Sequence, residues 1–102
     1  MNKLFEEIKF FFKRQDYEIS KVRENGNSNS LVVGGLSHRR VRIISRFRIS
    51  FCGELFDIQI DIIGSDGDMR KKVSKTVRQS SINSEYILYL YSELLWKLDL
   101  MF

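Results

Sequence analysis

A chain of 102 residues with 43% hydrophobic and 13% aromatic residues is long enough for one domain and too apolar to be disordered. The net charge of +4 mildly favours an acidic or phosphate-bearing partner, and a single cysteine, Cys52, excludes an internal disulfide. No apolar run reaches the roughly 18 residues that a membrane span needs, and Glu6 and Glu7 interrupt the apolar N-terminal stretch, which argues against a signal peptide. We therefore expect a cytoplasmic protein that does not enter membranes.

The N-terminal part of the chain predicts a helix and then a strand. Residues 3–14 place apolar side chains at helical spacing, namely Leu4, Ile8, Phe11 and Phe12. In the following "DYEISKV", Tyr17 and Ile19 alternate with polar residues, which is typical of a half-buried strand. Residues 24–30, "ENGNSNS", contain no apolar residue and hold an Asn-Gly turn signal, so we expect an exposed loop. A short strand over 31–33 follows, and Gly34-Gly35 should interrupt it as a bulge or turn.

Residues 40–63 predict a β-hairpin. "RVRIISRFRISFC" and "LFDIQIDII" both alternate, and Gly53-Glu54 between them suits a type II′ two-residue turn. Such a turn fixes the register, so that the numbers of paired residues sum to 107. The apolar odd-numbered residues of the first strand then face apolar residues of the second. On the other face Arg46 opposes Asp61, Arg48 opposes Gln59 and Ser50 opposes Asp57.

The C-terminal part predicts one or two helices after a turn at 64–68. In residues 69–79, Met69, Val73 and Val77 recur at i, i+4 and i+8, which favours a short basic helix over a further strand. Residues 84–101 predict a longer helix capped by Asn83 or Ser84. Its apolar face should contain Ile87, Leu90, Tyr91, Leu94, Leu98 and Met101.

The predicted elements together indicate a single α+β domain over residues 1–102. It would consist of an N-terminal helix, an antiparallel β-meander of three to four strands, and a C-terminal helix packed on one sheet face. The alternation in the hairpin predicts that the helices cover the face of the odd-numbered residues.

Four arginines share the other face of the predicted strand at residues 40–52. Arg46 and Arg48 have candidate partners on the next strand and could be structural. The outer end, residues 38–42, lies beyond this pairing, and we expect Arg39, Arg40 and Arg42, with Arg48, to be available to a partner. A second basic cluster in residues 70–78, with Lys71, Lys72 and Lys75, is either a solvated charge run or a phosphate contact.

The last helix carries apolar and aromatic residues on more than one side. We expect one short sheet in so small a domain to leave part of such wide apolar helix faces exposed. Tyr89 and Trp96 are of the residue types enriched in interfaces, so this helix could form a homodimer or bind another protein. Burial of the whole helix in the core is the alternative.

Candidates for catalysis are few. One His, one Cys and the absence of a Gly-rich phosphate loop exclude the common metal, nucleophile and nucleotide sites. Asp57 and Asp61 share a strand face, as in metal-dependent nucleases, but the companion lysine at strand spacing is missing. We therefore expect a non-enzymatic protein with no cofactor and no metal.

The sequence thus favours a small protein-binding module that occludes an acidic target surface. A stoichiometric inhibitor or an immunity or anti-defence protein of a phage or mobile element would have these properties. The alternative is a nucleic-acid-binding protein that contacts phosphates through residues 38–42 and 70–78.

Overall fold

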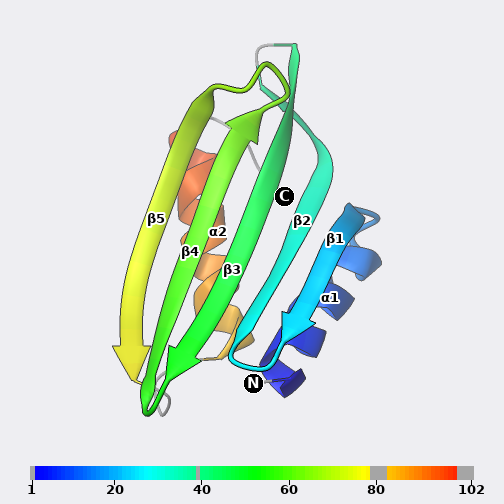
Figure 1. The fold of residues 1–102 in the computed structure, drawn as a ribbon. Helices are drawn as coiled ribbons and strands as arrows, with labels where there is room; N and C mark the ends of the chain where they lie inside the picture. The colour runs from blue at the N-terminus through cyan, green and yellow to red at the C-terminus, as the bar shows by residue number, and fades with distance from the viewer. Residues whose placement is uncertain (1, 39, 79–82, 99–102) are drawn as a thin grey trace.

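The computed structural model describes residues 2–38, 40–78 and 83–98, with only the backbone described at residues 2, 3 and 38. The elements are, in chain order, α1 (Asn2–Arg14), β1 (Glu18–Asn25), β2 (Ser28–His38), β3 (Val41–Cys52), β4 (Leu55–Gly64), β5 (Met69–Arg78) and α2 (Ser84–Lys97). The five strands form one sheet in the order β1-β2-β3-β4-β5, and every neighbouring pair is antiparallel. The chain therefore runs up and down through a meander (Figure 1).

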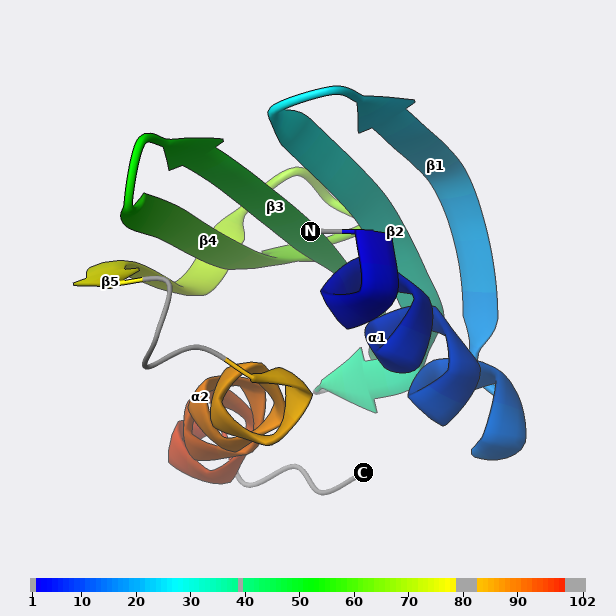
Figure 2. The ribbon, with the colours of Figure 1, turned by 90° about the horizontal axis from the view of Figure 1, so that it is seen from below.

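Both helices lie on the same face of the sheet, and neither of them covers the opposite face (Figure 2). The helix α1 contacts β1, and α2 contacts β4, β5 and α1. We call the uncovered side the open face. The expected α+β class, with helices on one side of an antiparallel sheet, is confirmed.

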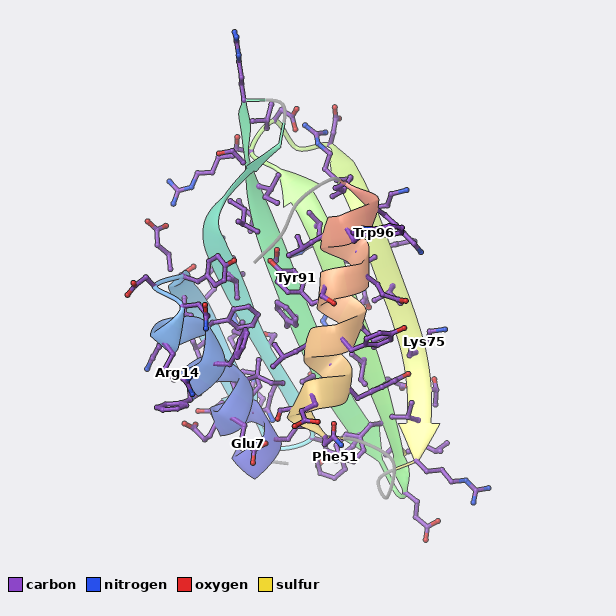
Figure 3. All side chains as sticks on the ribbon, turned by 180° about the vertical axis from the view of Figure 1, so that it is seen from behind. Glu7, Arg14, Phe51, Lys75, Tyr91 and Trp96 are labelled. Atoms are coloured by element: carbon purple, nitrogen blue, oxygen red, sulfur yellow. The ribbon has the colours of Figure 1, made fainter. Side chains whose placement is uncertain are left out.

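An aromatic cluster joins the two helices to the centre of the sheet. The ring of Phe12 on α1 lies 5.6 Å from that of Tyr91 on α2, and Phe47 on β3 lies within 5.3 Å of both. The hydroxyl groups of Tyr91 and Ser45 are hydrogen-bonded at 2.7 Å, so the buried polar end of the tyrosine has a partner. Figure 3 shows Tyr91 between α2 and the sheet. This cluster holds both helices against one side of the sheet. A ligand of the sheet would therefore bind on the open face.

The register predicted for the β3–β4 hairpin is confirmed. Phe51 pairs with Phe56, Phe47 with Ile60 and Arg46 with Asp61, as the two-residue turn requires. Gly53 has a φ of 62°, a value that L-residues rarely adopt and that the first central position of a type II′ turn needs.

Three predictions of secondary structure were wrong. Residues 24–30 are not a loop, because β1 and β2 continue to a tight turn at Gly26 and Asn27. Residues 69–78 form the edge strand β5 instead of a helix, which brings the sheet to five strands instead of three or four. The last helix ends at Lys97 with Leu98 as its C-cap, so it is shorter than the predicted 84–101, although Asn83 caps it as expected; residues 99–101 lie outside the described residues.

Two β-bulges modify the first half of the sheet. One falls between Val33 and Leu36, at the glycine pair where an interruption was predicted. The other falls between Ser20 and Arg23 on β1 and was not predicted. Lys21 in this second bulge has a left-handed φ of 49°. This bulge decides which basic side chains reach the open face.

Candidate binding surface

A groove runs along β2 on the open face of the sheet. Its floor consists of the small residues that β2 directs to this face, namely Ser30, Val32 and Gly34. Basic side chains of the two neighbouring strands stand on either side of it: Lys21 and Arg23 on β1, and Arg42, Arg46 and Arg48 on β3. We call this feature the basic groove. It exists because β2 presents short side chains between two strands that present long ones.

The β1 bulge brings Arg23 to the basic groove. Ser20 pairs with Val32 and Arg23 pairs with Ser30, so β1 uses one residue more than β2 between these pairs. Without the extra residue, the strict alternation of a strand would place Arg23 on the helix side. Sequence reasoning missed Lys21 and Arg23 for this reason. The only signal was that "SKVRE" breaks the alternation begun by Tyr17 and Ile19.

An ion pair between β3 and β4 holds Arg46 in place on the β3 side of the groove. The guanidinium of Arg46 donates to Asp61 Oδ2 at 3.2 Å, and the amide of Gln59 donates to the same oxygen at 3.2 Å. The side chain of Asp61 is only 8% exposed, whereas that of Arg46 is 51% exposed. The predicted structural role of Arg46 is therefore confirmed, and its outer part is still accessible.

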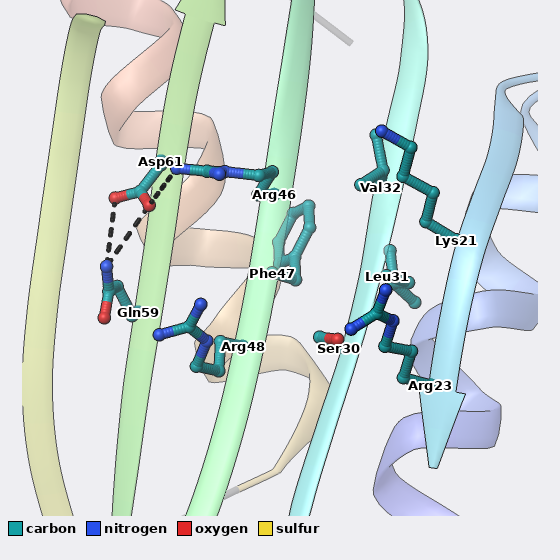
Figure 4. A pocket seen from close by; sticks show the side chains of 10 residues that line it. All are labelled: Lys21, Arg23, Ser30, Leu31, Val32, Arg46, Phe47, Arg48, Gln59 and Asp61. Carbon is teal, nitrogen blue, oxygen red and sulfur yellow. Dashed lines mark hydrogen bonds and ion pairs between the residues drawn. The ribbon is translucent and has the colours of Figure 1, made fainter.

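Arg23, Arg48 and Lys21 form no ion pair with any of the described residues and are exposed. Figure 4 shows Arg23 reaching over β2 towards Ser30, while Arg48 leans from β3 towards β4. The space between them is a hollow of about 180 Å³. The residues that line this hollow include four cationic side chains and one carboxylate, that of Asp61. The part of the groove over Ser30 and Val32 therefore has an excess of positive charge.

The other end of the groove, over Gly34, has little net charge, because an ion pair crosses it. Arg42 on β3 forms an ion pair with Glu18 on β1, two strands away. Gly34 lies between them, and a Cβ at this position would be 3.3 Å from Glu18 Oε2. The missing side chain of Gly34 thus makes room for the pair. Arg42 lies beyond the acids of the β3–β4 pairing, as predicted, but the expectation that it is available to a partner did not allow for this acid from β1.

The end of the groove over Gly34 also has an apolar floor. Val32, Ile44 and Ile63 are half-buried and line a hollow of about 500 Å³ together with Gly34 and the ion pair. A partly exposed aliphatic patch beside charged side chains can accept an apolar side chain of a ligand. The basic groove thus has two cationic positions, over Ser30 and Val32, and one apolar and nearly neutral position over Gly34.

The other predicted basic residues that the structure describes do not line the groove. Lys72 pairs with Asp61 and shares the open face, but Lys71 and Lys75 pair with the core residues Ile62 and Ile58 and so belong to the helix side of the edge strand. The cluster 70–78 therefore does not form one surface. Arg40 is exposed in the β2–β3 turn, and Arg39 lies outside the described residues.

Arg70, from the same cluster, is occupied within the β4–β5 turn. Its guanidinium lies 2.9 Å from Asp66 Oδ2 and 3.8 Å from Asp68 Oδ2. The Arg70 guanidinium beside Asp66 holds the pKa of that carboxyl below its ordinary value. These groups stabilise the turn and leave no cation there for a phosphate.

A second exposed surface lies on α2. Tyr89 and Trp96 are separated by two helical turns and are 56% and 75% exposed. The Tyr89 hydroxyl donates a hydrogen bond to Glu93 Oε1 at 2.7 Å, and this bond raises the pKa of the phenol. The two residues share the side of α2 that faces away from the core, as Figure 3 shows for Trp96.

The described residues contain no group of three or more His, Cys, Asp or Glu side chains that could hold a metal ion. In the same part of the chain, neither helix has the length and apolar character to cross a membrane. Comparison of the chain with family models, with curated proteins and with solved structures found no match.

Proposed function

We propose that this protein is a non-enzymatic binding module that covers an acidic surface of a partner protein with the open face of its sheet. The observation that carries the proposal is that Lys21, Arg23 and Arg48 form no ion pair within the described part of the chain and lie on the sheet face opposite to α1 and α2. Unpaired cations arranged on one rigid surface attract an acidic partner and fix its orientation. Such a protein would act stoichiometrically, as an inhibitor or an immunity or anti-defence protein does, and we place it in the cytoplasm.

Nucleic-acid binding through residues 38–42 and 70–78 is the alternative, and it has less support. In the described part of these segments, Arg42 and Arg70 have carboxylate partners, and Lys71 and Lys75 lie on the other side of the sheet from Lys72. The aromatic residues of the strands, Phe47, Phe51 and Phe56, belong to the core cluster or pack against it, so they cannot stack on bases.

We further propose that α2 forms a homodimer contact through Tyr89 and Trp96. A large exposed Trp and a Tyr on one helix face are of the residue types that dominate protein interfaces. This contact lies on the helix side, so a dimer would leave both basic grooves accessible.

The proposal is tested by capturing partners with the wild-type protein and with a double variant, Arg23→Glu/Arg48→Glu. Because neither arginine pairs with a carboxylate among the residues that the structure describes, we expect the variant to fold normally, which thermal unfolding checks. Proteins retained by the wild type and lost by the variant are then purified and mixed with it, and the mass of the complex is measured by light scattering.

The matched control is Lys13→Glu/Lys97→Glu, which changes the net charge by the same amount on exposed helix positions. We expect one acidic protein to form a stoichiometric complex with the wild type and the control but not with the groove variant. If nuclease treatment removes everything that the wild type retains, the alternative is correct and the proposal is wrong.

A further inference from the structure

We propose that the basic groove binds an extended segment of the partner with the pattern acidic-x-acidic-x-apolar, lying along β2. The inference deepens the proposed function and rests on it. It identifies the partner by chemistry and spacing instead of by net charge alone.

The spacing follows from the geometry of β2. Its residues on the open face, Ser30, Val32 and Gly34, alternate with residues that point to the core. Alternate residues of a strand are separated by about 6.6–6.8 Å, and the same holds for any extended peptide. A segment that lies parallel to β2 therefore places its alternate side chains over Ser30, Val32 and Gly34 in turn.

The three positions differ in charge. Over Ser30, the unpaired Arg23 and Arg48 lie on the two strands that pair with it. Over Val32, Lys21 reaches in from the β1 side, whereas the Arg46 guanidinium on the β3 side extends to Asp61 on β4 and is 51% exposed (Figure 4). These two positions each accept a carboxylate, because Arg23 and Lys21 reach over β2 and can give a charge-assisted contact, and Arg48 and Arg46 add positive charge on the β3 side.

The position over Gly34 has the opposite preference. Here Glu18 and Arg42 neutralise each other, and Ile44 and Ile63 supply the exposed aliphatic surface. A third carboxylate would meet the Glu18 carboxylate, whereas an aliphatic side chain would cover the isoleucines and exclude water from them. A nucleic-acid backbone carries a phosphate at every unit and would bring a negative charge to Glu18 at this position, whereas a peptide can place an aliphatic side chain there, so we assign the groove to a peptide.

The test uses short fluorescent peptides with Glu at the two acidic positions, Ile at the apolar position and Ser elsewhere. The two chain directions are made as separate peptides, because the groove does not set the direction. A scrambled peptide of the same composition has adjacent acids and a displaced Ile. An oligothymidylate of similar length is the fourth probe, and binding is measured by fluorescence anisotropy at low and at physiological salt.

We expect one of the two patterned peptides to bind at least about tenfold more tightly than the scrambled one. Only this peptide places its two carboxylates over Ser30 and Val32 and its isoleucine over Gly34. Arg23→Glu/Arg48→Glu should abolish this binding, and Arg23→Gln/Arg48→Gln, which introduces no new charge, should weaken it by about tenfold or more. Ile44→Asp should remove the preference for the patterned peptide over the scrambled one. The control Lys13→Glu/Lys97→Glu should bind like the wild type.

Three results would overturn the inference, and they separate it from the proposed function. Equal binding of patterned and scrambled peptides, still lost in the arginine variants, would reject the pattern but keep an acidic partner. Tighter binding of the oligothymidylate than of any peptide would reject the peptide and support the nucleic-acid alternative. If no acidic probe binds the wild type, both the inference and the proposed function are wrong.

Discussion

Three polar side chains are buried among the described residues, and they differ in what they contact. Ser45 is hydrogen-bonded to Tyr91, and Asp61 accepts from Arg46 and Gln59. Asn29 is 1% exposed, and neither its Oδ1 nor its Nδ2 has a hydrogen-bond partner in residues 2–38, 40–78 and 83–98. A buried polar group without a partner costs about 1–3 kcal/mol. The segment around Asn29 reads as a polar loop in the sequence, yet its position on β2 directs it into the core.

We expect Asn29→Leu to stabilise the protein by about 1–2 kcal/mol, because leucine has nearly the same shape and needs no hydrogen bond. The matched variant Asn29→Asp should instead destabilise it by about 3–5 kcal/mol at neutral pH, since it buries an unpaired charge. Urea unfolding measures both. A loss of stability in Asn29→Leu comparable to that in Asn29→Asp would show that the amide has a structural role that the fold does not reveal.

Tyr91 makes stability depend on alkaline pH. Burial raises the pKa of Tyr91 to about 12, against about 10 for an exposed tyrosine. Between these values the unfolded chain loses its phenolic proton while the folded protein keeps it, so the free energy of unfolding falls as the pH rises. Below about pH 10 both forms are protonated and the effect is absent.

The expected contribution of Tyr91 is a loss of about 1 kcal/mol by pH 11 relative to pH 8. Tyr91→Phe should lack this part of the pH dependence, although it should be less stable at pH 8 by about 1–2 kcal/mol because Ser45 loses its partner. Denaturant unfolding across this pH range compares the two proteins. Parallel curves for wild type and variant would contradict the assignment.

At the scale of elements, β1 and β5 show where a hydrophobic pattern is ambiguous. In β5, Val73 and Val77 are four residues apart, a spacing that places two residues on one face of a helix and also on one face of a strand. The segment forms a strand because Val73 pairs with the core residue Ile60 on β4. In β1, the bulge reverses the faces of all residues beyond it, and the broken alternation of "SKVRE" indicates a disturbance without showing which residues change face.

The conformation of the β1 bulge can be tested at Lys21. Its φ of 49° suits glycine and is unfavourable for β-branched residues. We expect Lys21→Val to be less stable than Lys21→Gly by about 1–2 kcal/mol, although valine is normally the better strand residue. Thermal or urea unfolding of the two variants measures the difference. If valine is tolerated as well as glycine, β1 pairs with β2 without this bulge.

At the scale of the whole molecule, the two faces differ in chemistry. The helix side buries the core and exposes Tyr89 and Trp96, whereas the open face exposes the basic groove. A partner on one face therefore does not compete with a partner on the other. This separation allows the proposed dimer contact and the proposed groove function to be tested independently.

If α2 forms the dimer, the wild-type protein should sediment at about twice the mass of the 12.1 kDa chain. Trp96→Ser should weaken the dimer by about 2 kcal/mol or more, or roughly thirtyfold in the dissociation constant. Lys13→Ser on α1 is the exposed control and should leave the mass unchanged. A wild-type protein that is monomeric at all accessible concentrations would rule out the contact.

The sequence alone determined the α+β class, the extent of α1 to within one residue, a cap at Asn83 or Ser84, and the complete register of the β3–β4 hairpin. These features depend on nearby residues, because alternation, helical spacing and a two-residue turn act over short stretches of chain. The predicted pairing of Arg46 with Asp61 followed from that register and is confirmed.

Only the tertiary structure decided how the basic residues are grouped. It added Lys21 and Arg23 to the surface, paired Arg42 with Glu18 across Gly34, and divided the lysines of β5 between the two faces. Each of these outcomes depends on a bulge or on a strand two positions away in the sheet. The physical reason is that a side chain's face is set by the register of its whole strand, whereas its charge is set by the residue alone.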